Sequence, residues 1–354
     1  MEFKKYNSID NSYREKTIHK IKELGYNSKD IEWVVLEKIH GANFSLWMNE
    51  EGIKPAKRTS FIDDTDGKFF NYDSVIDVYH ENLRAIYELS KDMIADLVEM
   101  DKVTHDGKVE VILYGEIFGG NYGHDDVDKV SDAIKVQKGV DYCPHNDFYV
   151  FDMKINGRML NYDLFREFME ATGFLYAKPL HRGTFEECVE YENEYQTTIP
   201  AVYGLPEIEN NICEGNVIKP VHTLFFPSKD RVILKNKNDK FKESSREPKE
   251  KRQKKKEDIT LSENSMEVLE DIRLHITENR LRNVISHIGE INNKMFGRLT
   301  GEFTKDTLEE YLKDNKEEYE KIEKAERKKI QKNISNLCAE VIRNNFVNII
   351  DGCF

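Results

Sequence analysis

One short turn brings together three side chains that could do chemistry, Lys38, His40 and Asn43. Gly41 allows the chain to turn tightly there and lets a ligand approach the backbone. A lysine held in this way can act as an amine nucleophile once it has lost its proton. With an ordinary pKa of ~10.4, it is neutral at pH 7 in only about one molecule in 2500, a handicap of roughly 4–5 kcal/mol. Burial and neighbouring cations can lower that pKa. The turn therefore predicts a lysine nucleophile that its surroundings must activate.

Strands on both sides of the turn must position these residues. Residues 33–36 and 44–48 are rich in the branched and aromatic residues that favour strands. Residues 109–113 alternate weakly and predict a strand that leads to Glu116, and residues 148–153 predict another. Short strands with interspersed helices, in no regular alternation, indicate an α+β domain built on antiparallel sheets.

Helices are expected between these strands. A short helix should end near Gly25, and Asp73 could cap a helix that runs to about Met100. Residues 162–172 predict a helix closed by Gly173. The run from Thr184 to Glu187 is a capping-box pattern that predicts the start of another helix.

Five further motifs follow the Lys-x-His-Gly turn along the chain. They are Lys57-Arg58-Thr59, Gly-Glu-x-x-Gly at 115–119, Phe151-Asp152, Glu-Gly-x-x-x-Lys at 214–219, and Lys-x-Lys at 235–237. In this order they resemble the motifs of covalent nucleotidyltransferases, and in detail those of the RNA ligase 2 family, which includes the kinetoplastid RNA-editing ligases. Histidine at position 40, where DNA ligases and capping enzymes usually carry aspartate, favours RNA ligase. The resemblance also implies the nucleotidyltransferase fold.

The resemblance implies an ATP-dependent RNA ligase that works in three steps. The lysine attacks the α-phosphate of ATP and becomes lysyl-AMP, AMP moves to the 5′-phosphate of an RNA end, and a 3′-hydroxyl then displaces AMP. Such chemistry depends mostly on positioning and charge neutralisation. The expected cofactors are ATP and Mg²⁺ or Mn²⁺, and the expected substrate is nicked duplex RNA or RNA ends.

Each motif residue carries an expected role by this resemblance. The residues expected to be catalytic are Lys38, His40, Asn43, Arg58 and Asp152. Those expected to contact ATP or AMP are Glu37, Lys38, Arg58, Glu116, Phe151, Glu214, Lys219, Lys235 and Lys237. Glu214 is also the expected metal ligand, since oxygen ligands suit Mg²⁺. Lys235 and Lys237 are two apart, so on a strand both ammonium groups face one way. Tyr149 and Phe148 are rivals of Phe151 as the aromatic that stacks on adenine.

The chain changes character after residue 242. Residues 243–258 combine Ser, Glu and Pro with a run of Lys and Arg, which predicts a basic flexible linker between an adenylyltransferase domain (1–242) and a C-terminal domain (259–354). Apolar residues at helical spacing in 266–288, and a charged helical pattern over 316–350, predict an all-helical domain. Residues 279–291 resemble the C-terminal domain of RNA ligase 2.

Charge bears on how the chain could hold nucleic acid. The formal net charge is −13, yet residues 235–256 hold eleven Lys or Arg against four Asp or Glu, a local balance of +7. Segregated charge of this kind predicts RNA contacts by Lys254, Lys255 and Lys256, with Arg280 and Arg282 of the helical domain beside them. The five cysteines form no Cys-x-x-Cys pair, which indicates reduced thiols and no zinc site. We expect a cytoplasmic, monomeric protein, with no membrane partner.

Two alternatives remain at this stage. A DNA ligase or a capping guanylyltransferase of the same superfamily would share most of the motifs, although His40 argues against both. A non-catalytic RNA-binding scaffold of the same fold is a different class, and the intact lysines and glutamates of the motifs argue against it.

Residues 119–146 are longer than in the phage enzymes and more similar to the editing-ligase branch.

Overall fold

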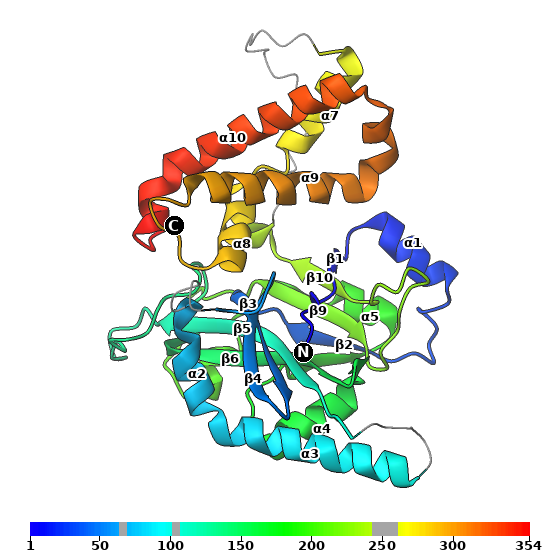
Figure 1. The fold of residues 1–354 in the computed structure, drawn as a ribbon, viewed down its shortest axis with the longest axis vertical. Coiled ribbons are helices and arrows are strands. Elements are labelled where there is room, and N and C mark those ends of the chain that lie inside the picture. Colours follow the sequence, from blue (N-terminus) through cyan, green and yellow to red (C-terminus); the bar gives the residue numbers. More distant parts are fainter. Residues whose placement is uncertain (64–68, 101–106, 243–260) are drawn as a thin grey trace. The chain divides into compact units, whose positions relative to one another are not determined.

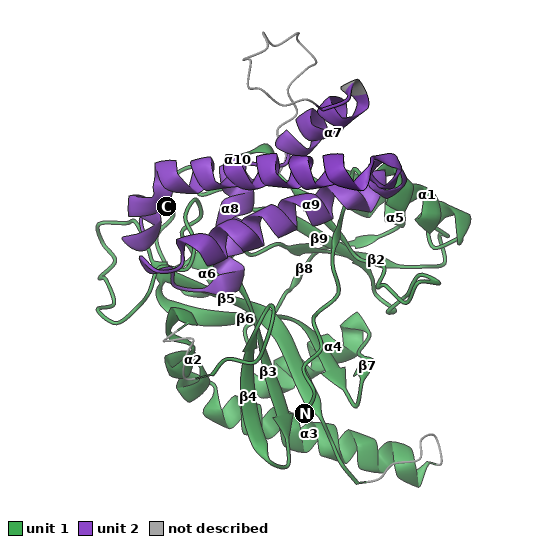
Figure 2. Cartoon of the chain, turned by 45° about the horizontal axis from the view of Figure 1, so that its top comes forward, with its two compact units in different colours: residues 1–240 green, residues 241–354 purple. Residues whose placement is uncertain are grey.

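A computed structural model describes residues 1–63, 69–100, 107–242 and 261–354 of the chain. The structure divides into two compact units, residues 1–240 and residues 241–354, which we call the N-terminal and C-terminal units (Figure 2). The expected linker at 243–258 lies outside the described residues.

Two five-stranded sheets form the N-terminal unit (Figure 1). The first sheet has the order β1 (Asp10–Asn11), β10 (Leu234–Lys237), β9 (Gly215–Pro220), β2 (Trp33–Glu37) and β8 (Pro179–Gly183). The second has the order β4 (Gly52–Lys57), β3 (Ala42–Asn49), β5 (Val111–Asn121), β6 (Cys143–Ile155) and β7 (Arg158–Met159). Within both sheets the pairs are antiparallel, except that β1 runs parallel to β10. The expected α+β class with antiparallel sheets is confirmed.

Helices cover the sheets because their apolar faces need partners. The helices of this unit are α1 (Glu15–Glu23), α2 (Tyr72–Val78), α3 (His80–Glu99), α4 (Tyr162–Thr172), α5 (Phe185–Glu190) and α6 (Ile199–Val202), with single 3₁₀ turns at Phe69–Asn71 and Asp239–Phe241. Ile21 of α1 and Phe185 of α5 pack with Trp33 and Val35 of β2 in one buried cluster. The predicted helix end at Gly173 and the predicted capping box at Thr184 are both present.

One predicted helix start was wrong. Asp73 does not cap a helix that runs to Met100, because the N-cap of α2 is Asn71, in the left-handed conformation, and Asp73 lies in the first turn. The segment is also two helices, since α2 ends at Val78 and Tyr79 separates it from α3. The Tyr79 hydroxyl donates to the Asp147 carboxylate at 2.8 Å, a long-range contact that the local pattern does not contain.

The C-terminal unit is helical in its described part. It contains α7 (Glu263–Arg273), α8 (Glu278–Ile288), α9 (Phe296–Lys321) and α10 (Lys324–Ile350). The charged pattern over 316–350 predicted one long helix, and the structure corrects it: Ile322 is extended, so the chain reverses between α9 and α10. A shared apolar core explains the reversal, because Leu299 and Phe303 of α9 and Ile334 of α10 are buried in one cluster. No helix of the described residues is long and apolar enough to cross a membrane.

Candidate active site

The predicted nucleophile turn joins the two sheets. Residues 38–41 follow β2 of the first sheet and precede β3 of the second. The backbone N–H of Lys38 donates to the carbonyl of Gly215 at 2.9 Å, so one end of the turn is fixed to β9. A Cβ atom on Gly41 would lie 2.5 Å from the carbonyl oxygen of Ile117, so only glycine lets the turn pack this closely on β5.

A buried carboxylate holds two lysines of the motifs. The Lys38 Nζ atom lies 2.8 Å from Glu214 Oε2, and the Lys237 Nζ atom lies 2.7 Å from Glu214 Oε1. The Glu214 side chain is 2% exposed and that of Lys38 is 18% exposed. Three motifs that are far apart in sequence therefore meet at one carboxylate.

These charges set the protonation of Glu214. Burial opposes its ionisation, but the ammonium groups of Lys237 and Lys38 outweigh burial and hold the Glu214 pKa well below its ordinary value. The His40 Nδ1 atom lies 3.6 Å from Glu214 Oε2. Burial lowers the pKa of His40 from its ordinary value, and the hydrogen bond with Glu214 only partly opposes that shift. We therefore expect an ionised Glu214 beside a neutral imidazole at pH 7.

A second carboxylate of the site, Glu116, lies in the pair formed by β3 and β5. Glu116 of β5 is directly opposite Asn43 of β3 in the sheet register. Burial raises the pKa of Glu116 to about 7, the positive charges of Lys38 and Arg58 and the hydrogen bond from Asn43 lower it, and the charge of Glu214 raises it. The structure thus brings Lys38, Asn43, Arg58, Glu116 and Glu214 into one electrostatic neighbourhood.

The Lys-x-Lys motif lies on β10 as predicted. Lys235 pairs with Val217 and Lys237 with Gly215 of β9. Leu234 is buried in the apolar cluster under the first sheet, so the two lysines occupy the opposite face of the strand. Lys237 reaches Glu214, and Lys235 is half-buried beside it on the same face.

The three aromatic residues considered for adenine stacking differ in burial. Phe148 and Tyr149 are buried in the core, whereas Phe151 is half-buried. The register of β5 with β6 shifts between Tyr114, which faces Asp152, and Gly115, which faces Val150, so Phe151 is the extra residue of a β-bulge. Bulges re-aim side chains next to functional sites. Of the three aromatics, Phe151 is thus the one whose side chain is not fully buried, and its stacking on adenine stays a prediction.

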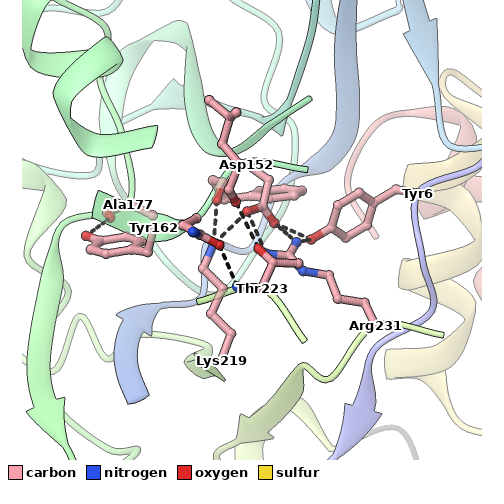
Figure 3. Close-up of polar contacts among 10 residues, drawn as sticks. Tyr6, Asp152, Tyr162, Ala177, Lys219, Thr223 and Arg231 are labelled. Carbon is pink, nitrogen blue, oxygen red and sulfur yellow. Dashed lines mark hydrogen bonds and ion pairs between the residues drawn. The ribbon is translucent and has the colours of Figure 1, made fainter. Parts of the chain in front are cut away.

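Asp152 and Lys219 meet in a buried charge cluster (Figure 3). The Lys219 Nζ atom lies 2.7 Å from Asp152 Oδ1 and also donates to the Phe151 carbonyl at 2.9 Å. Arg231 donates to both Asp152 oxygens, and the Tyr6 hydroxyl donates to Oδ2. Both carboxylate oxygens are thus engaged, so we expect Asp152 and Lys219 to act on the site through the backbone of Phe151.

Glu37 is also engaged by neighbours within the unit. Its carboxylate accepts hydrogen bonds from the hydroxyls of Thr197 and Thr198, and from the Thr198 N–H at 2.9 Å. Burial raises its pKa, and these hydrogen bonds oppose the shift. In this arrangement Glu37 fixes the 197–198 segment at the end of β2. Its predicted contact with adenine stays a prediction.

Glu214, the predicted metal ligand, does not belong to a group of metal-ligating side chains among the described residues. Within the described residues, no three His, Cys, Asp or Glu side chains come together in a way that could hold a metal ion. Mg²⁺ is commonly held by one or two carboxylates with water and substrate phosphates as its other ligands. Both Glu214 oxygens contact lysine ammonium groups in this structure, and its predicted role as a metal ligand stays a prediction.

The residues expected to bind RNA differ in exposure. The Arg280 side chain is 3% exposed, and its NH1 atom lies 2.7 Å from Asp306 Oδ2, so Arg280 holds α8 to α9. Arg282 is more exposed, lies 3.6 Å from Glu278, and stacks over the Phe354 ring at 4.7 Å. Lys254, Lys255 and Lys256 lie outside the described residues. The RNA contacts of all five stay a prediction.

Several residues of the site were missed by sequence reasoning. Arg231 lies four residues before Lys235 of the Lys-x-Lys motif, and this nearness to a motif is a signal that sequence reasoning could have used. Tyr6 lies in a mostly polar stretch that offers no such signal. The Arg58 NH1 atom donates to the Tyr6 carbonyl at 3.1 Å, and the Tyr6 and Phe151 rings are 5.2 Å apart. Tyr6 therefore joins the charge cluster to two predicted site residues.

Two family profiles match the chain. The profile described as RNA ligase matches residues 31–237, and the profile described as T4 RNA ligase 2 C-terminal matches residues 255–340. The first covers all the motifs that meet at Glu214. The second covers most of the C-terminal unit.

Curated relatives include two proteins of Trypanosoma brucei brucei. Mitochondrial RNA-editing ligase 2 is 30% identical over 335 residues, which cover 81% of this chain and 76% of that protein. Mitochondrial RNA-editing ligase 1 is 31% identical over 220 residues, which cover 54% of this chain and 45% of that protein. The chain thus spans less than half the length of editing ligase 1.

Solved structures with partial likeness include Naegleria gruberi RNA ligase. A variant of that enzyme with AMP and manganese has a TM-score of 0.40 and 14% identity, over 68% of this chain and 57% of that one. The same enzyme with pyrophosphate has a TM-score of 0.38 and 13% identity, over 68% of this chain and 57% of that one.

Proposed function

The chain belongs to the RNA ligase family, and from this premise we propose that it joins a 3′-hydroxyl to a 5′-phosphate RNA end at the expense of ATP, preferably at nicks in duplex RNA. The observation that carries the proposal is the meeting of Lys38, Glu214 and Lys237, with contacts of 2.8 and 2.7 Å. Lys38 and Lys237 contact the two oxygens of the Glu214 carboxylate, so a largely buried amine stands beside an orienting carboxylate and near a second cation, as a nucleophilic lysine requires.

In the first step the Lys38 Nζ atom attacks the α-phosphorus of ATP. The amine attacks after its ammonium proton has passed to solvent, since the Lys38 side chain is 18% exposed. A nitrogen–phosphorus bond forms, the bond to the pyrophosphate oxygen breaks, pyrophosphate leaves, and the nitrogen releases a second proton to solvent. Glu214 contacts the Lys38 amine, but a carboxylate with so low a pKa is a weak base, so its role is to orient the amine. Lys235 and Lys237 stand on one face of β10, where they can neutralise phosphate charge.

The remaining parts of the nucleotide have candidate partners nearby. Glu116 can accept hydrogen bonds from the ribose hydroxyls, and Arg58 can offer a planar fork to the ribose and the RNA end. Phe151, half-buried at its bulge, can stack on adenine. A divalent cation at Glu214, Mg²⁺ or Mn²⁺, would neutralise developing phosphate charge.

One assay tests the proposal against its rivals. We expect the protein with ATP and Mg²⁺ to seal nicked duplex RNA faster than nicked duplex DNA or single-stranded RNA ends. Labelled ATP should leave an AMP adduct and labelled GTP should leave no GMP adduct, which distinguishes a ligase from a capping enzyme. Absence of any adduct and any sealing would support the scaffold alternative. We expect this activity from a monomer in the cytoplasm.

Asn43 should separate the steps of the reaction. It hydrogen-bonds Glu116 across the β3–β5 pair and does not belong to the lysine pair on β10. Asn43→Ala should therefore slow the sealing of a pre-adenylylated nick by at least about tenfold, the usual scale for losing a charge-assisted contact in a transition state. The rate of lysyl-AMP formation should fall less. His40→Ala should likewise slow sealing more than it slows lysyl-AMP formation. Single-turnover rates of the two half-reactions provide the measurement, and equal losses in both would contradict the assignment.

The basic run should contribute to RNA affinity through phosphate contacts. Each phosphate neutralised steepens the dependence of binding on salt by about 0.9 in log–log slope for a duplex. Replacing Lys254, Lys255 and Lys256 together with Gln should lower that slope by up to about 2.7 and leave the reaction with ATP alone nearly unchanged. Fluorescence anisotropy of a nicked RNA duplex across a salt series provides the measurement.

An equal loss of charge elsewhere serves as the control. Lys16 and Lys22 of α1 and nearby Lys29 are exposed. Their triple replacement with Gln should change the slope less than replacement of the basic run does. Identical slopes for wild type and the 254–256 variant would show that the run does not touch phosphate.

A further inference from the structure

The 119–146 segment contacts the turn that carries the nucleophile. The backbone N–H of His40 donates to the Tyr142 hydroxyl at 2.8 Å. The side-chain amide of Gln137 donates to the carbonyl of Gly41 at 3.3 Å. Two consecutive residues of the turn therefore have partners in this segment, while Lys38 N–H is fixed on the other side by Gly215. Neither Tyr142 nor Gln137 belongs to a motif.

The segment is itself held firmly in place. Cβ atoms on Gly119 and Gly120 would lie 2.2 Å from the His145 carbonyl and 2.1 Å from the Ile134 carbonyl, so the segment folds back onto the end of β5 with no space between. Both glycines have positive φ, at 81° and 85°, which other residues rarely adopt. The segment that carries Tyr142 and Gln137 is thus packed closely against β5 at residues 134 and 145.

Tyr142 is suited to a fixed hydrogen bond. Its side chain is buried, and its ring packs edge-on against Phe118 with centroids 5.4 Å apart. Burial, followed by the charge of Glu37, raises its pKa well above the ordinary value, so the hydroxyl stays neutral. A buried backbone N–H without a partner is costly, and this hydroxyl provides one for His40.

We propose that the 119–146 segment positions the nucleophile turn, with Tyr142 and Gln137 as positioning residues for His40 and Gly41. This inference deepens the proposed ligase function, since it assigns to the RNA-dependent steps a segment that lies outside the motifs except for Gly119. Lys38 is anchored independently through Gly215. Loss of the Tyr142 hydroxyl should therefore disturb His40 more than Lys38.

Hydrogen exchange tests the contact without any need for activity. Tyr142→Phe removes the acceptor and keeps the ring, so the His40 amide should exchange about tenfold faster than in wild type. Tyr122→Phe is the matched control, because the Tyr122 hydroxyl belongs to the same segment but donates to the Pro206 carbonyl. Exchange at His40 should be unchanged in that variant. Unchanged exchange in Tyr142→Phe would overturn the proposal.

Step-resolved kinetics test the consequence. Tyr142→Phe should slow the sealing of a pre-adenylylated nick about tenfold and slow lysyl-AMP formation less. Gln137→Met keeps the side-chain length, removes the donor, and should lower sealing about threefold, because its bond is longer and half-exposed. KM for ATP should stay near wild type in both, and Tyr122→Phe should stay within about twofold throughout.

The outcomes separate the two proposals. Two results would overturn the positioning role even if the His40 amide exchanges faster in Tyr142→Phe. One is an equal loss of rate in both half-reactions of that variant, and the other is the same loss of sealing rate in Tyr122→Phe. A wild-type protein that forms no AMP adduct would overturn the proposed ligase function, and the exchange result would still decide whether the segment holds the turn.

Discussion

Replacement of Lys38 with arginine should abolish the AMP adduct as completely as replacement with alanine. Arginine would keep a positive charge beside Glu214, which lies 2.8 Å from the Lys38 amine. A guanidinium stays protonated at any ordinary pH and cannot supply the lone pair that forms the phosphoramidate bond. The arginine variant would keep an ion pair with Glu214 but would form no AMP adduct. This prediction therefore separates the charge of Lys38 from its nucleophilicity.

Intact mass after incubation with ATP and Mg²⁺ measures the adduct directly. Lys54→Ala is the control, because Lys54 is an exposed lysine on β4 of the same unit. We expect that variant and wild type to gain one AMP, and the two Lys38 variants to gain none. An AMP adduct on Lys38→Ala would show that another residue is the nucleophile.

The sequence predicted the parts of the site that local pattern controls. Turn residues and strand runs placed Lys38 between two strands, and the two-residue spacing placed Lys235 and Lys237 on one face of β10. The structure adds that β2 and β3 belong to different sheets. Because the turn crosses from one sheet to the other, Glu214, which immediately precedes β9 of the first sheet, and Glu116 of the second sheet can both approach Lys38.

Local pattern could not predict what long-range contacts decide. The bulge that separates Phe151 from the buried Phe148 and Tyr149 depends on how β6 pairs with β5. The reversal at Ile322 depends on the core shared by α9 and α10. Tyr6 reaches Asp152 across 146 positions of sequence. In each case the determining partner lies far along the chain, so no window of neighbouring residues contains it.

The Asp152 cluster is where we expect the largest effect on stability. Lys219, Arg231 and Tyr6 all donate to this carboxylate, and the side chains of Asp152, Lys219 and Arg231 are each 2% exposed. Asp152→Asn would leave two buried cations without their counter-charge, and breaking a buried ion pair costs about 3–5 kcal/mol. It would also disturb Lys219, which donates to the Phe151 carbonyl. We therefore expect weaker nucleotide binding as well as lower stability.

Urea unfolding followed by tryptophan fluorescence measures this loss. The chain has two tryptophans, and both Trp33 and Trp47 lie in the N-terminal unit. Asp163→Asn is the control, because the Asp163–Arg182 pair is 42% and 28% exposed and such pairs contribute only about 0–1 kcal/mol. A loss for Asp152→Asn no larger than that of the control would show that the cluster is not a stabilising contact.

The pH dependence of this difference provides an independent test of the ion pairs. Burial opposes ionisation of Asp152, but Arg231 and Lys219 outweigh it and hold its pKa below the ordinary value. A carboxyl with a depressed pKa stabilises the fold fully above its unfolded value of ~3.9, and that stabilisation is lost as the pH falls toward the folded-state pKa. The gap between wild type and Asp152→Asn should therefore narrow as the pH falls below ~3.9. A gap that stays the same down to pH ~3 would mean that the asparagine variant fails through its shape or hydrogen bonding, and that the charge of Asp152 contributes little.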